Sequence, residues 1–135
     1  MMEDKRITYA DVGGKEFPLC LTVAAHQKII DTWGGLQQMA QDMTGGEESI
    51  PKTAKLCHIL MEGGAARVKA LAWMEGVETP ALPTVPDLEL LEELMDLKDV
   101  KDMSAKAFEA IRVSRGVTVE VAQEDNEKNA NATQE

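Results

Sequence analysis

The N-terminal residues alternate between apolar and polar positions, which is the pattern of a half-buried β-strand. The apolar positions are Ile7 and Tyr9, followed after a break by Phe17, Leu19 and Leu21. Two such runs close together along the chain predict a β-hairpin over residues 7–21. A two-stranded hairpin is marginal by itself, so we expect it to pack on helices.

A glycine pair between the two runs predicts the turn of this hairpin. We place a three-residue loop at Val12-Gly13-Gly14, with Gly14 in the left-handed conformation that glycine adopts without steric cost. This register sets Asp11 opposite Lys15, whereas a two-residue Gly13-Gly14 turn would set Asp11 against Glu16. We favour the longer loop because it pairs opposite charges across the strands.

Helical periodicity follows the hairpin. Thr22 is a suitable N-cap for a helix from Val23 to Trp33, and residues 36–43 are expected to form a second, short helix. Apolar positions then recur at helical spacing over residues 52–75, after a start capped by Ser49. Because the Gly63-Gly64 pair would cost roughly 2 kcal/mol in an unbroken helix, we predict two helices with a bend there.

The C-terminal part begins with a linker. Residues 76–86 contain three of the five prolines, which prevent regular helix. Asp87 then caps an amphipathic helix, and Ser104 is expected to begin a last helix that ends at Gly116. Residues 117–121 read as a short strand. Residues 122–135 have no apolar pattern, so we predict a disordered acidic tail.

These elements predict an α+β fold that is mainly α, with an N-terminal β-hairpin packed on a small bundle of about four to five helices. We expect a single domain over residues 1–121: the hairpin at 7–21, helices at 22–75, the proline-rich linker at 76–86 and C-terminal helices at 87–116. The disordered tail at 122–135 completes the chain.

Composition narrows the function classes. The 135 residues include 24 acidic and 14 basic side chains, a formal charge of −10. Such a chain offers no cationic surface for nucleic acid or for an anionic membrane. No apolar run is long enough to span a bilayer, and the polar N-terminus lacks the apolar core of a signal peptide. Cys20 and Cys57 read as reduced thiols in a cytoplasmic protein.

Catalytic and metal-binding patterns are not found in the sequence. His26 and His58 are the two histidines, and neither forms a zinc-ligand spacing with a cysteine or another histidine. The carboxylate pairs Glu47-Glu48 and Glu92-Glu93 lie in a polar loop and a charge run, where a solvated surface is the usual explanation. We therefore predict no catalytic residue, no metal, no cofactor and no enzymatic activity, unless folding brings a histidine against a cysteine.

A protein-binding element is better supported. The helix after Asp87 has an apolar stripe on one side and a strongly acidic opposite face, and such a helix can pack on its own domain or on a partner. The candidate partner-binding residues are Leu88, Leu91, Leu94 and Met95. Met39, Met43, Met61, Met74, Met95 and Met103 recur along the helices. Flexible methionines suit variable binding surfaces, but filling a core poor in aromatics is the favoured explanation.

The order of these features resembles that of the tail assembly chaperones of long-tailed phages and prophages of Gram-positive bacteria. The residues that carry the resemblance are Ile7-Thr8-Tyr9-Ala10-Asp11-Val12-Gly13-Gly14-Lys15-Glu16-Phe17-Pro18-Leu19, which is similar to that family's hairpin, and Trp33-Gly34-Gly35-Leu36. The helices around residues 56–73, the proline- and acid-rich stretch, a final helix and a polar acidic tail follow in the same order.

This resemblance implies a non-enzymatic role in the host bacterial cytoplasm and absence from the mature virion. The implied partner is the tape-measure protein, which such chaperones keep soluble during tail morphogenesis; the tail-tube protein and further copies of the chain are additional candidate partners. Two other classes remain open: a small structural tail or connector protein, which would be retained in particles, and a regulatory module that binds another protein.

Overall fold

The computed structural model describes residues 6–116 and confirms the fold class over that range. The elements are β1 (Thr8–Val12), β2 (Lys15–Leu19), α1 (Val23–Trp33), α2 (Leu36–Asp42), the short 3-10 helix η1 (Gly46–Glu48), α3 (Ser49–Glu75), α4 (Leu88–Leu94) and α5 (Leu97–Ser114). The strand predicted at residues 117–121 and the tail predicted at 122–135 lie outside the described residues.

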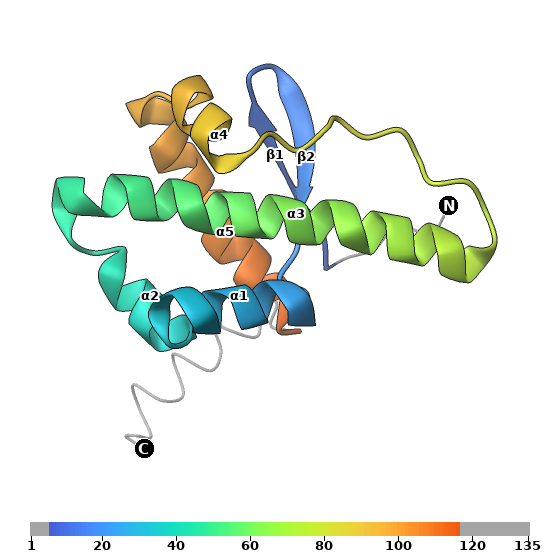
Figure 1. The fold of residues 1–135 in the computed structure, drawn as a ribbon, viewed down its shortest axis with the longest axis horizontal. Coiled ribbons are helices and arrows are strands. Elements are labelled where there is room, and N and C mark those ends of the chain that lie inside the picture. The colour runs from blue at the N-terminus through green and yellow to red at the C-terminus, as the bar shows by residue number, and fades with distance from the viewer. Residues whose placement is uncertain (1–5, 117–135) are drawn as a thin grey trace, which may run out of the picture.

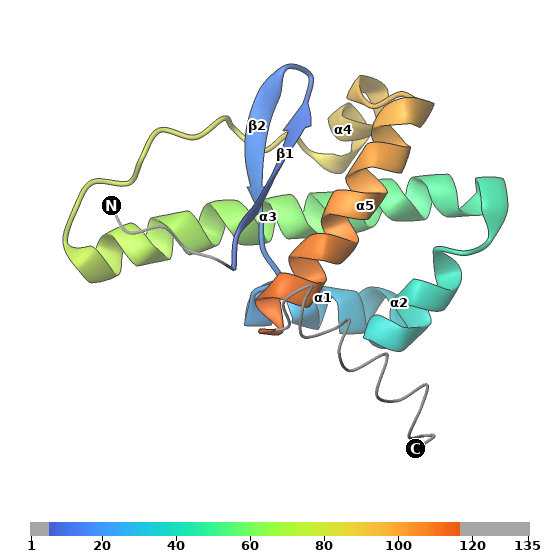
Figure 2. The same cartoon turned by 180° about the vertical axis from the view of Figure 1, so that it is seen from behind.

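The long helix α3 is the element on which the others assemble (Figure 1). Strand β2 and helices α1, α4 and α5 all contact α3, while β1 contacts α5. Seen from behind, α5 crosses α3 beside the hairpin, with α1 and α2 beyond the other edge of α3 (Figure 2). The linker of residues 76–87 returns along the molecule from the C-terminal end of α3 to α4.

The hairpin has a different register from the one predicted. Its turn is the two-residue Gly13-Gly14, and Asp11 pairs with Glu16, not with Lys15. Both glycines have positive φ, 60° and 80°, as the tight turns favoured in hairpins require. Asp11 and Glu16 are exposed, so water screens their repulsion. The core decides the register, because it buries Thr8, Ala10 and Val12 and leaves Tyr9 in solvent.

Helix α3 is continuous, and the predicted bend at Gly63-Gly64 is wrong. The glycines are required there because the backbone of the hairpin crosses the helix at this point. A Cβ atom on Gly64 would overlap the carbonyl of Pro18, and one on Gly63 would overlap the carbonyl oxygen of Cys20. The amide of Cys20 donates a 3.1 Å hydrogen bond to the carbonyl of Leu60, which fixes β2 to α3. This close contact offsets the helix propensity that two glycines lose.

The helix boundaries agree with the sequence at some caps and not at others. Thr22 and Asp87 are N-caps as predicted, each accepting a hydrogen bond from a backbone amide, at 3.0 and 2.8 Å. Ser49 is instead the first residue of α3, where its hydroxyl donates to the carbonyl of Gly46. Ser104 lies inside α5, which begins earlier, at a capping box formed by Asp96 and Asp99. The expected two C-terminal helices are present, but the boundary between them is at residues 95–96.

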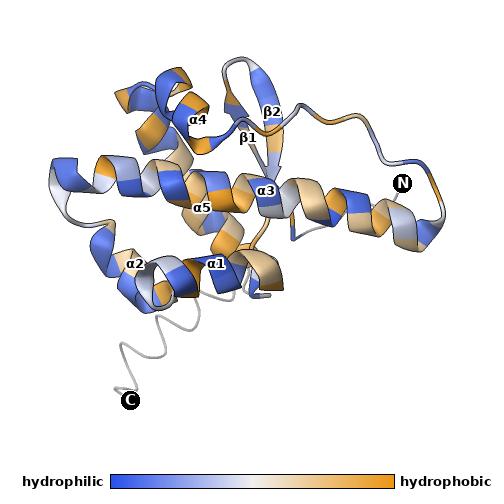
Figure 3. Cartoon of the chain, viewed as in Figure 1, coloured by the Kyte–Doolittle hydropathy of each residue, from blue (hydrophilic) through white to orange (hydrophobic). Residues whose placement is uncertain are grey.

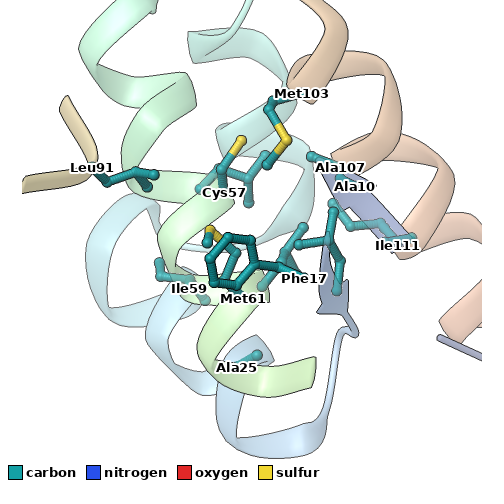
Figure 4. Close-up of a cluster of buried hydrophobic side chains, with 14 of the residues drawn as sticks. Ala10, Phe17, Ala25, Cys57, Ile59, Met61, Leu91, Met103, Ala107 and Ile111 are labelled. Atoms are coloured by element: carbon teal, nitrogen blue, oxygen red, sulfur yellow. The ribbon is translucent and has the colours of Figure 1, made fainter. Parts of the chain in front are cut away.

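The core lies between the hairpin, α3 and α5. Figure 4 shows Phe17 of β2, Cys57 and Ile59 of α3 and Met103 of α5 converging on one cluster. Met39, Met61 and Met103 are almost completely buried, whereas Met43 and Met95 pack at the edge of the core. Of the six methionines singled out in the sequence, Met74 is the exposed one. Filling the core is therefore the confirmed role of most of them.

Candidate partner-binding surface

Helix α4 lies between two aspartate N-caps, its own at Asp87 and that of α5 at Asp96. The carboxylate of Asp87 accepts the amide of Leu90 at its start, and the chain leaves the helix at Met95, whose backbone is extended. Asp96 then starts α5 through its reciprocal hydrogen bonds with Asp99, at 2.9 and 3.2 Å. Since the two helices are separated by only two residues, α4 and the first turn of α5 form one corner of the molecule.

The predicted stripe divides between the core and the surface. Leu91 is completely buried in the main core, Met95 packs against its edge and Leu88 is half-buried. Leu94 is the one member of the predicted four that is classed as exposed, with 46% of its surface accessible. The apolar face of α4 therefore packs largely on its own domain, which is the first of the two arrangements that its amphipathicity allows.

Two further leucines at this corner are exposed to solvent. Leu90 and Leu97 are 52% and 71% exposed, and together with Leu94 they form what we call the corner patch. Glu89, Glu92 and Glu93 of α4 are also exposed. Figure 3 shows hydrophilic and hydrophobic positions side by side on α4. The sequence analysis did not select Leu90 because it lies next to Leu91 and so falls outside the apolar stripe. Helical periodicity identifies the buried stripe and does not show which leucines outside it are exposed.

A cleft of about 240 Å³ opens beside the corner patch. Its apolar walls come from Ile50, Pro51 and Ala54 at the start of α3 and from Met95, Leu97 and Val100 at the α4–α5 junction. Glu92 and Asp96 also line it. A partner that offers apolar side chains flanked by basic ones would match this arrangement.

The cysteines are not placed for nucleophilic chemistry. Cys57 is fully buried, and desolvation raises the pKa of its thiol to about 12, so the reactive thiolate is strongly disfavoured. Cys20 is also buried, with its sulfur 3.6 Å from the hydroxyl of Ser114.

The histidines have separate surroundings. His58 lies 3.7 Å from the carboxylate of Glu62, which also forms a 2.9 Å ion pair with Lys28. These side chains line a polar cleft of about 270 Å³ on α1 and α3, together with Lys55 and Asp31. His26 is half-buried on α1. In the described part of the chain no three His, Cys, Asp or Glu side chains gather as a metal site would need.

None of the helices within residues 6–116 combines the length and the apolar character that crossing a bilayer requires. The chain matches no protein-family model, no curated protein and no solved structure.

Proposed function

We propose that this protein is a phage tail assembly chaperone, which binds the tape-measure protein and keeps it soluble in the host bacterial cytoplasm until the tail tube has formed around it. The observation that carries the proposal is the corner patch, where three leucines are exposed beside a cleft with apolar walls. The resemblance of the hairpin and of the Trp33-Gly34-Gly35-Leu36 segment to that family gives the partner.

In this role the protein would bind the partner reversibly and prevent it from aggregating. A long helical partner has an apolar face that aggregates until other subunits cover it, and a small protein with exposed leucines can cover it first. The acidic side chains around the corner patch keep the complex soluble, because a net charge far from zero opposes further association. No step of this role requires a catalytic group, a cofactor or a metal.

The decisive experiment is co-expression with the long helical protein encoded beside this gene, with soluble yield of the partner as the readout. We expect the partner to stay soluble only when this protein is present. If the soluble yield of the partner is the same with and without this protein, the proposal is wrong. Recovery of the protein in assembled particles would indicate a structural tail or connector protein, and a tight heterodimer without any effect on solubility would indicate a regulatory module.

The corner patch is tested by Leu90→Asp combined with Leu97→Asp. Both residues are exposed and both lie in the first turn of a helix, where an acidic side chain is favourable, so the fold should be retained. The matched control is Gln37→Asp with Gln38→Asp, which adds the same charge at exposed positions in the first turn of α2. Loss of soluble partner with the leucine variant alone supports the corner patch; equal yields would exclude it.

The experiment cannot use Leu91. This side chain is completely buried, so Leu91→Asp would place a charge in the core and unfold the domain. Any loss of solubilisation would then be uninformative. Leu94→Gln is the better substitution within the predicted stripe, because Leu94 is half in solvent and glutamine is a good helix former.

A further inference from the structure

The cleft beside the corner patch lies between the starts of two helices. Figure 1 shows the first turns of α3 on the same side of the molecule as the α4–α5 corner. Ile50 and Pro51 of α3 form part of one wall, and Leu97 and Val100 of α5 form part of the other. Leu97 belongs both to the cleft and to the corner patch, so the two make one continuous apolar surface.

The size of the cleft limits what it can receive. Its volume is about 240 Å³, whereas an α-helix with its side chains is about 10–12 Å across. The cleft therefore admits side chains of a partner but not the backbone of a helix. A helix lying across the surface meets this condition, because its residues three or four positions apart project on the same side.

Acidic side chains flank this apolar surface on both sides. Glu47 and Glu48 are exposed and come just before Ile50 of one wall. Glu92 and Asp96 are exposed and belong to the α4–α5 wall. Within residues 6–116, none of these four carboxylates forms an ion pair with a basic side chain.

The lysines of this region do not balance its acidic charge. Acidic side chains outnumber basic ones by seven to two over residues 87–102. Lys52, near the start of α3, lies 4.0 Å from the carboxylate of Asp42, so its charge is already paired. The apolar surface therefore lies between two regions of negative potential, which favour a positively charged partner.

We propose that this surface binds an amphipathic helix whose apolar stripe is flanked on both sides by lysine or arginine. The apolar side chains of that helix enter the cleft and cover the leucines of the corner patch, and its basic side chains pair with the carboxylates on either side. Helices flanked by acidic side chains are rejected, because like charges then face each other. The inference rests on the proposed chaperone function and names the class of segment that the protein binds in the tape-measure protein.

The first test titrates the full chain with designed peptides of about 18 residues, which is about five helical turns. All of them carry leucines on one helical face; the first has lysines on both sides of that face and the second has glutamates. Calorimetry should show binding of the lysine peptide, weakened as salt rises because salt screens the ion pairs, and no binding of the glutamate peptide. Equal affinities for the two peptides would overturn the proposal.

A third peptide separates recognition of a helix from general attraction between opposite charges. It has the composition of the lysine peptide, but its leucines are scattered around the helix. We expect it to bind at least about tenfold more weakly, because it can bury few of its leucines in the cleft and the corner patch at once. If it binds as tightly as the lysine peptide, the surface attracts charge alone and the proposal is wrong.

Variants of the chain test the acidic flanks. Glu47→Gln with Glu92→Gln should weaken binding of the lysine peptide several-fold, because it removes one carboxylate from each side of the cleft. The matched control is Glu75→Gln with Glu78→Gln, the same change at exposed positions at the other end of α3 and just beyond it. The control should bind the peptide as the natural chain does. Equal losses in the two variants would contradict binding at the cleft.

The apolar contact has its own pair of variants. Leu97→Gln should weaken binding of the lysine peptide about tenfold, because the peptide no longer covers an apolar side chain there. The matched control is Val23→Gln. Val23 is the first residue of α1 and is 90% exposed, whereas Leu97 is the first residue of α5 and is 71% exposed. A loss with Val23→Gln as large as that with Leu97→Gln would reject the cleft as the binding site.

Peptide binding is measured without the tape-measure protein, so its outcome is separate from that of co-expression. If the tape-measure protein stays soluble but the lysine peptide does not bind, the chaperone proposal stands and this inference is wrong. If the lysine peptide binds at the cleft but the soluble yield of the tape-measure protein is unchanged, recognition of a basic amphipathic helix stands and the chaperone proposal is wrong.

Discussion

The two parts of α3 share one continuous helix but have opposite surroundings. In residues 49–64, Leu56, Cys57 and Leu60 are completely buried under the hairpin, α1 and α5. In residues 65–75, Val68 and Ala72 remain buried while Trp73 and Met74 are in solvent. The first part organises the fold, and the second leaves two large apolar side chains in solvent. Burial along a helix is therefore set by which elements reach it.

A large loss of stability is expected at Gly64, where the two parts of α3 meet. Gly64→Ala should destabilise the domain by about 3 kcal/mol, because the added methyl group overlaps the backbone of Pro18 and forces β2 away from α3. Gain of helix propensity, about 1 kcal/mol, offsets only part of the overlap. Urea denaturation measures the free energy of unfolding.

The control for this substitution is Gly45→Ala. A Cβ atom at Gly45 meets its nearest neighbour, the carbonyl oxygen of Asp42, at 3.7 Å, which is ordinary contact. Its stability should stay within about 0.5 kcal/mol of the natural protein. If Gly64→Ala is equally harmless, the hairpin does not cross α3 as closely as described.

An intermediate effect on stability is expected from the buried thiol of Cys57 at alkaline pH. The pKa of Cys57 is about 12 in the folded protein, against 9.0 as its ordinary value. Between these two values the unfolded chain releases the proton and the folded protein retains it, so stability falls as pH rises above 9. From pH 8 to pH 10 this thiol should reduce the free energy of unfolding by about 1.4 kcal/mol.

Comparison with Cys57→Ala isolates this contribution from the other groups that titrate in alkali. The variant is less stable at pH 8 because it leaves a small cavity, but the fall between pH 8 and pH 10 should be smaller by about 1.4 kcal/mol. Equal falls in the two proteins would mean that the thiol is not desolvated. A thiol placed in the exposed part, as in Ala70→Cys, should react freely with a thiol reagent.

The smallest effect is expected at Trp73. With 79% of its surface exposed, Trp73→Ala should change the stability of the monomer by less than about 0.5 kcal/mol. By contrast, Leu60→Ala in the buried part should cost about 2–5 kcal/mol. Both losses of stability are measured by urea denaturation. A large loss at Trp73 would show that this part of α3 supports the fold and is not a free surface.

Local signals in the sequence predicted most of the secondary structure. The alternation at residues 7–21 gave the hairpin, and Thr22 and Asp87 marked two helix starts, because a capping side chain acts on an amide only three residues away. The start of α5 was missed because its capping box uses Asp96 and Asp99, whereas the usual signature has Ser or Thr followed by Glu or Gln. Ser104 was then the nearest conventional signal.

The candidate surface was predicted less completely. Amphipathicity identified α4, but it cannot tell which molecule its apolar face meets, and Leu91 and Met95 pack on their own domain. The exposed leucines of the corner patch include Leu90 and Leu97, which are separated by the end of one helix and the start of the next. The cleft beside them needs the start of α3 as well, and no spacing along the chain indicates that contact.

By itself, the sequence determined the fold class, the positions of most elements and the strongly acidic character of the protein, because these depend on composition and on residues a few positions apart. Tertiary structure alone decided the hairpin register, the continuity of α3 and the division of the Leu88–Met95 stripe between core and surface. In each case the packing of one element against another decides the outcome. Gly64 is tolerated within a helix only because the Pro18 carbonyl lies against it, and Asp11 faces Glu16 because the opposite face of the hairpin is buried.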